Sequence, residues 1–130
     1  MKRRNCLTTM LAAGVIATPL LAAPAARPIR LHVDLTVNPD KEKELLHNFE
    51  TIFRPAAAKQ PGYIEVKLLK LRTTLTGKAP AGVNYRFELS YQSEELRQKW
   101  IASDVHQKVW PTLENLLATK NYTVMLFDVI

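Results

Sequence analysis

The nine residues from Ile29 to Val37, IRLHVDLTV, alternate without exception between apolar and polar side chains, and this alternation is the strongest constraint on the fold. Successive side chains of a β-strand point to opposite faces of its sheet, so the stretch predicts a strand with one buried face. The predicted buried face carries Ile29, Leu31, Val33, Leu35 and Val37. The opposite face carries Arg30, His32, Asp34 and Thr36.

Three later stretches also predict strands. Residues 63–72, YIEVKLLKLR, place Ile64, Val66 and Leu68 on one face, and residues 83–91, VNYRFELSY, alternate in the same way. The segment between them, TGKAPAG at 76–82, is rich in turn residues, so the two strands are predicted to form a hairpin. Residues 121–130, NYTVMLFDVI, predict a closing strand that is mostly apolar.

Helical patterns fill the gaps between these strands. In the first, Asn38 is a cap candidate with Pro39 at the first helical position, and Pro55 is predicted to kink or end the helix. In the second, Ser93 caps a short helix, and Ser103 or Asp104 caps another. The apolar positions at helical spacing are Leu45, Phe49, Ile52 and Ala56 in the first helix, Leu96 and Trp100 in the short helix, and Val109, Leu113, Leu116 and Leu117 in the last.

The order β-α-β-β-α-β predicts an α+β protein of the ferredoxin-like arrangement, a four-stranded antiparallel sheet with helices on one face. The other face is left with polar side chains. It is either solvated, as in many antiparallel sheets, or turned toward a second subunit that closes two sheets into a dimeric α/β barrel. The residues concerned are Arg30, His32, Asp34, Glu65, Lys67, Asn84, Arg86 and Glu88.

Residues 1–25 read as a secretory signal peptide that precedes a domain at 26–130. A basic start at Lys2, Arg3 and Arg4 is followed by an uncharged run and by Ala23-Pro24-Ala25, a small-x-small site for signal peptidase. The uncharged run is too short to span a bilayer, so no stable membrane span is expected after cleavage. Export to the periplasm is expected, by the Sec route or, given Arg3-Arg4, by the twin-arginine route.

Removing this segment changes what the composition implies. Three of the 18 basic residues lie within it, which leaves 15 against 12 acidic residues and lowers the formal net charge from +6 to +3. No basic run interleaved with aromatic residues remains, so nucleic acid is not an expected partner. Cys6 is the one cysteine of the chain, and the mature domain therefore has no disulfide and no thiol nucleophile.

The mature sequence resembles the antibiotic biosynthesis monooxygenase family, whose members form dimeric α/β barrels. The resemblance rests on NPDKEKELL after the first strand, on QPGYIEVKLL after the long helix, and on YRFELSYQSEELRQKWIASDVHQ across the third strand and the next helix. Ser103 and His106 occupy the family's pattern of a serine or threonine shortly before a histidine.

This resemblance implies a monooxygenase that oxidises a small quinol or phenolic compound with O2 and uses no metal, flavin or haem. The substrate supplies the electrons, while the protein shapes a dry pocket and stabilises the phenolate. The expected partners are a small aromatic substrate, O2 and a second copy of the chain. The candidates are His106 and His32 as catalytic residues and Trp100, Asn84, Arg86 and Trp110 as substrate-binding residues.

The candidates on the predicted helices also have a purely structural explanation. His106 and Trp110 share a helical stripe with Leu113 and Leu117, so both can be core residues, and Trp100 can anchor the helix on the sheet. His32 lies on the polar face and is a base candidate because imidazole titrates near neutral pH. No histidine pair has the spacing of metal ligands.

Two alternatives remain open. The segment WIASDV, residues 100–105, also resembles the haem-degrading monooxygenases, but Trp110 stands where their histidine is expected and His32 stands near their first-strand asparagine. Haem is the alternative cofactor that this second resemblance implies. The other alternative is a non-catalytic exported dimer that binds a small molecule.

Overall fold

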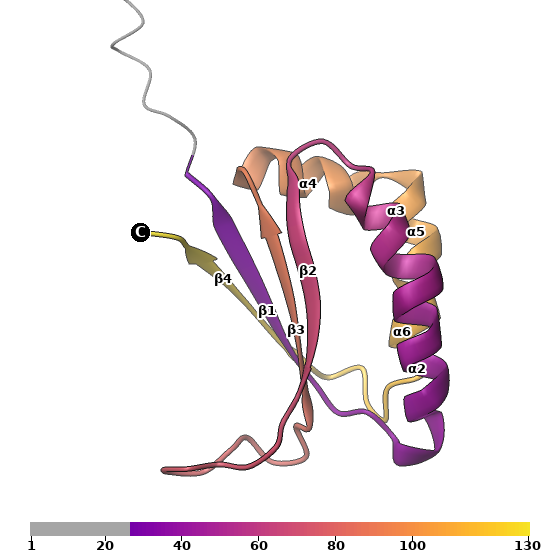
Figure 1. The fold of residues 1–130 in the computed structure, drawn as a ribbon, viewed down its shortest axis with the longest axis vertical. Coiled ribbons are helices and arrows are strands. Elements are labelled where there is room, and N and C mark those ends of the chain that lie inside the picture. The colour runs from indigo at the N-terminus through magenta and orange to yellow at the C-terminus, as the bar shows by residue number, and fades with distance from the viewer. Residues whose placement is uncertain (1–26) are drawn as a thin grey trace, which may run out of the picture.

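A computed structural model describes residues 27–130, and the predicted signal peptide lies outside the described residues. Within this range four antiparallel strands form one sheet in the order β2-β3-β1-β4 (Figure 1). The strands are β1 (Ile29–Leu35), β2 (Tyr63–Lys70), β3 (Tyr85–Tyr91) and β4 (Thr123–Asp128). The central strand β1 pairs with β3 and β4, so that Leu31 faces Leu89 on one side and Leu126 on the other. The predicted ferredoxin-like α+β fold is confirmed.

Two groups of helices cover one face of the sheet (Figure 1). The first consists of η2 (Pro39–Lys41), α2 (Glu42–Asn48), η3 (Phe49–Phe53) and α3 (Arg54–Ala58). The second consists of α4 (Glu94–Ala102), α5 (Asp104–Val109) and α6 (Pro111–Glu114). The predicted caps are present: Asn38 accepts a hydrogen bond from the backbone N–H of Asp40, and Ser93 accepts one from that of Leu96. Each satisfies a backbone donor that the first helical turn leaves unpaired.

The sequence predicts that Pro55 kinks or ends the first helix. The helix continues to Ala58, so the prediction that it ends at Pro55 is wrong. The turn before the proline is instead widened into the π-helical segment η3, where the N–H of Arg54 reaches back to Phe49. A proline ring clashes with the carbonyl four residues earlier in a regular helix, and a wider turn relieves that clash. The buried stripe is therefore Leu45, Phe49, Phe53 and Ala57, and Ile52 is 37% exposed.

Strand β2 also departs from the predicted alternation. The pairing with β3 shifts between Tyr63 and Glu65, so Ile64 lies in an irregularity and is 47% exposed. A bulge of this kind puts one extra residue in a strand and changes which side chains share a face. Tyr63, Val66 and Leu68 now lie opposite Tyr91, Leu89 and Phe87 of the core face. The predicted buried position of Ile64 is therefore wrong.

The last helical stretch breaks near its middle. The sequence predicts a single helix through Leu117, whereas α5 ends at Val109 and α6 begins at Pro111. Proline has no backbone N–H to continue the α5 ladder but is tolerated at the start of the next helix. Trp110 lies at the junction of the two helices, and Leu113 and Leu116 stay buried beyond it.

Candidate active site

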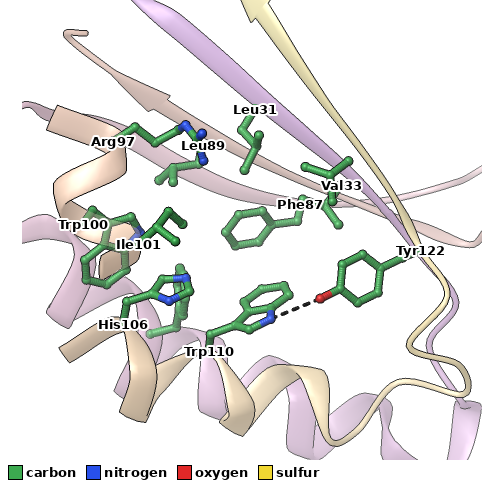
Figure 2. A pocket seen from close by; sticks show the side chains of 12 residues that line it. Leu31, Val33, Phe87, Leu89, Arg97, Trp100, Ile101, His106, Trp110 and Tyr122 are labelled. Atoms are coloured by element: carbon green, nitrogen blue, oxygen red, sulfur yellow. Dashed lines mark hydrogen bonds between the residues drawn. The ribbon is translucent and has the colours of Figure 1, made fainter. Parts of the chain in front are cut away.

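A cavity of about 210 Å3 lies between the helices α4 to α6 and the helix-facing side of the sheet (Figure 2). Its walls come from β1, β3, both helical groups, the segment that leads into β4 and β4 itself. Most of the lining is apolar and much of it aromatic. The lining residues are Leu31, Val33, Phe53, Phe87, Leu89, Arg97, Trp100, Ile101, His106, Trp110, Tyr122 and Val124.

His106 lies between the two tryptophans of this lining. Its ring meets that of Trp100 edge to face at a centroid distance of 5.0 Å, and it stacks on Trp110 at 6.3 Å with 12° between the planes. Trp100 is buried and packs edge to face on Phe53. Aromatic pairs prefer these offset and perpendicular arrangements, so the imidazole is held in a fixed aromatic frame.

The break between α4 and α5 explains how His106 reaches the cavity. Ser103 ends α4 and caps α5, and its hydroxyl donates to the carbonyl of Trp100 at 2.6 Å while it accepts from the N–H of His106 at 3.2 Å. Ser103 thus links the backbones of Trp100 and His106. His106 and Trp110 are four residues apart and therefore project from the same face of α5.

The electrostatics of the cavity keep His106 neutral. Burial lowers the pKa of His106 below its usual 6.5, the positive charge of Arg97 lowers it further, and the carboxylate of Glu114 opposes both effects. Desolvation disfavours a charged imidazolium, so the direction follows from the apolar walls. The Nδ1 atom is buried and has no hydrogen-bond partner among the described residues, which is consistent with an uncharged ring.

A short hydrogen-bond chain closes the other end of the cavity. Trp110 Nε1 donates to the hydroxyl of Tyr122 at 3.3 Å, and that hydroxyl donates to Glu114 Oε2 at 2.5 Å. Burial raises the pKa of Tyr122, and the hydrogen bond to Glu114 raises it further. Sequence reasoning missed Tyr122, Glu114 and Arg97, because nothing in their local patterns distinguishes them from surface positions.

The structure brings three of the six predicted site residues together, namely His106, Trp100 and Trp110. His32 lies on the opposite face of the sheet, where its Nε2 is 3.1 Å from Glu88 Oε2 and its ring packs on Phe127 at 4.7 Å. Arg86 is on that face as well and donates to Asp34 at 2.8 Å.

Asn84 has a structural role in the described chain. Its side chain accepts from the N–H of Val37 at 2.8 Å and donates to the carbonyl of the same residue at 2.9 Å. These two bonds tie the end of the β2–β3 loop to the end of β1. Asn84 therefore lies away from the cavity, as His32 and Arg86 do.

Among residues 27–130, no group of three or more His, Cys, Asp or Glu side chains is placed to hold a metal ion. None of the helices in this part of the chain has the length and apolar character needed to cross a membrane.

At the level of sequence, no family model and no curated protein matches the chain. Solved structures do share its fold. A proposed antibiotic biosynthesis monooxygenase from Caulobacter crescentus aligns over 81% of this chain and 92% of its own, with a TM-score of 0.62 and 19% identity. A second, from Bordetella bronchiseptica, covers 80% of this chain and 98% of its own, with a TM-score of 0.63 and 14% identity.

SnoaB from Streptomyces nogalater, a cofactor-independent oxygenase, is a further structural neighbour. It covers 81% of this chain and 95% of its own, with a TM-score of 0.57 and 18% identity. The resemblance to antibiotic biosynthesis monooxygenases that the sequence predicts is thus confirmed for the fold. Identities this low establish the fold and not the reaction.

Proposed function

We propose that this protein is a cofactor-independent monooxygenase of the antibiotic biosynthesis monooxygenase kind, which oxidises a small quinol or phenol with O2. The observation that carries the proposal is a half-buried histidine, His106, whose pKa is lowered by burial in the wall of a cavity built from aromatic and aliphatic side chains. Apolar and aromatic walls favour an aromatic ring, and a neutral imidazole can accept a phenolic proton.

The proposed reaction begins when His106 accepts the proton of a ring hydroxyl, through Nε2 since Nδ1 is buried. The resulting phenolate passes one electron to O2, and recombination of the two radicals forms a carbon–oxygen bond and a peroxide anion, which takes the proton back from His106 to give a hydroperoxide. The O–O bond then breaks. One oxygen atom stays on the ring, the other leaves as water with the two hydrogen atoms lost by the quinol, and the substrate supplies all the electrons.

The cavity favours a small substrate. Pockets for drug-sized ligands have roughly 300–1,000 Å3, and this one has about 210 Å3. One aromatic ring, or two fused rings with some adjustment of side chains, suits that volume. The indole ring of Trp110 and the ring edge of Phe87 would hold an aromatic substrate beside His106.

We propose that the cavity does not hold haem, the alternative cofactor. A haem macrocycle exceeds the volume available, and the aromatic packing of Trp100 against Phe53 and His106 would have to open to admit it. No step of the proposed reaction passes through haem. A haem titration followed by the Soret band tests the alternative, and a saturable spectral shift would favour it over the quinol.

The decisive experiment is oxygen uptake by the purified protein with a panel of simple hydroquinones and naphthols, measured against uncatalysed autoxidation. We expect uptake of one O2 per quinol and the appearance of a hydroxylated quinone. An oxygen trace that matches autoxidation for every compound would instead favour a non-catalytic binding protein.

We also propose that the protein acts as an exported homodimer. The support for a dimer is the exposed apolar strand β4, in which Met125 is 36% exposed and Phe127 44% on the uncovered face of the sheet. The support for export is the basic and apolar pattern of residues 1–25, which lies outside the described residues.

A further inference from the structure

Arg97 is the one side chain with a permanent charge in a cavity wall that is otherwise apolar or aromatic within the described chain. It belongs to α4, one turn before Trp100, and only 17% of its side chain is exposed. Buried guanidinium groups carry a desolvation cost and are normally held by a partner. A cationic group in the wall of a cavity for small aromatic molecules therefore needs an explanation.

Glu94 holds the guanidinium in place but leaves part of it free. Arg97 Nε lies 2.6 Å from Glu94 Oε1, and Nη2 lies 2.8 Å from Oε2. The third nitrogen, Nη1, has no hydrogen-bond partner among residues 27–130. Glu94 is not part of the cavity wall. The carboxylate of Glu94 thus orients the guanidinium from outside the cavity.

The position of Arg97 in the cavity is opposite to that of Tyr122 (Figure 2). Its side chain reaches from α4 toward Leu89 and Leu31, whereas Tyr122 lies at the far end beside Val33 (Figure 2). The hydroxyl of Tyr122 already donates to Glu114 and accepts from Trp110. Arg97 is therefore the group that offers an uncommitted donor and a positive charge to a ligand.

We propose that Arg97 selects aromatic substrates that carry a carboxylate on the ring. This inference rests on the proposed function and names the substrate class of the same cavity. A carboxylate at Nη1 forms a charge-assisted hydrogen bond in a site with little water, whereas an uncharged substituent of equal size does not. His106 then meets the hydroxyl-bearing part of the ring.

The test uses two probes that share the hydroquinone ring, gentisate and its uncharged methyl ester. Isothermal titration calorimetry without oxygen measures binding apart from turnover. We expect the unaltered protein to bind gentisate roughly 10- to 100-fold more tightly, the range that a charge-assisted hydrogen bond gives. Equal affinities, or no binding of either probe, would overturn the inference.

Variants test whether Arg97 causes the preference for gentisate over its ester. Arg97→Leu is expected to abolish the preference, and Arg97→Lys to keep part of it. The matched control is Arg54→Leu, because Arg54 forms a similar intrahelical pair with Glu50 but is exposed and outside the cavity. That variant should keep the full preference. A preference that survives in a folded Arg97→Leu protein, as checked by circular dichroism, would also overturn the proposal.

Oxygen uptake separates this inference from the proposed function. Arg97→Leu should raise KM for gentisate far more than it changes kcat, since Arg97 binds the carboxylate and His106 accepts the proton. Tight gentisate binding without any oxygen uptake supports the role of Arg97 and contradicts the monooxygenase. Equal kcat/KM for gentisate and its ester supports the monooxygenase and contradicts the role of Arg97.

Discussion

His106 is the residue on which the proposed chemistry depends. Two tryptophan rings fix its position, the backbone N–H is bound by Ser103, and the apolar wall keeps its ring neutral. A core histidine without a chemical role would share the burial but would have no reason to line a cavity. The two interpretations differ in what a substitution does to turnover and to stability.

We expect His106→Ala to lower kcat by about 10²–10⁴-fold, the usual contribution of one positioned proton-transfer group. Melting temperature and oxygen uptake are measured on the same preparations. Trp100→Phe is the comparison, because it keeps most of the apolar bulk that packs on Phe53 and should retain turnover if packing is its only role. An unstable but fully active His106→Ala protein would show that His106 is a core residue.

The lowered pKa of His106 predicts a loss of stability in mild acid. An unfolded histidine takes up a proton near pH 6.5, whereas the buried ring does so only at lower pH. Between these two values the unfolded chain binds more protons, so the free energy of unfolding falls as the pH falls below about 6.5. Urea melts at pH 5 to 8 should show this slope, and His106→Gln should reduce it.

Two interruptions of the helices determine the shape of the site. The widened turn η3 lets Phe53 follow Phe49 into the core, and the break at Ser103 turns α5 so that His106 lies beside Trp100. Both are local departures from a regular helix, and each places an aromatic or titratable side chain against the cavity. The break at Ser103 can be tested directly.

Ser103→Ala should cost about 1 kcal/mol of stability, the typical effect of losing a helix cap. It should also lower turnover, because the hydroxyl ties Trp100 to the first turn of α5 and so sets the position of His106. Ser93→Ala removes the equivalent cap of α4 and serves as the control. A similar loss of stability in both variants, with turnover reduced only in Ser103→Ala, is the expected result. Equal turnover in both would contradict a positioning role for Ser103.

At the scale of the whole molecule, the sheet has one face covered by helices and one uncovered. The uncovered face carries the His32–Glu88 and Arg86–Asp34 pairs, and Phe127 packs beside His32. Strand β4 lies at the sheet edge and exposes apolar side chains. Exposed apolar surface of this kind favours a contact with another protein surface.

We expect a homodimer at micromolar concentration in sedimentation or light scattering. Phe127→Lys puts a charge on the uncovered face and should shift the equilibrium toward the monomer. Leu75→Lys is the matched control, because Leu75 is 92% exposed in the β2–β3 loop and outside that face. A monomeric mass for the unaltered protein would contradict the proposed dimer.

We expect export to remove the first 25 residues. The pattern of residues 1–25 is that of a signal peptide with cleavage after Ala25. Mass spectrometry of the protein from its native host should find a start at Ala26. A soluble cytoplasmic form that retains Lys2 would contradict this expectation.

The sequence by itself determined the fold class. The alternation in β1, the hairpin between β2 and β3 and the caps at Asn38 and Ser93 are local signals, since each depends on the side-chain period or on bonds within one turn. Local reasoning was wrong at Ile64 and Ile52. A bulge and a widened turn shift the side-chain period by one residue, and composition does not reveal either of them.

Only the tertiary structure decided where the site lies. The sequence grouped His32, Asn84 and Arg86 with His106, but the sheet separates them, because alternate residues of a strand project from opposite faces. The cavity is instead closed by Phe53 of the first helical group, by Val33 of β1 and by Tyr122 immediately before β4. Their proximity depends on how the layers pack, and no local pattern contains that information.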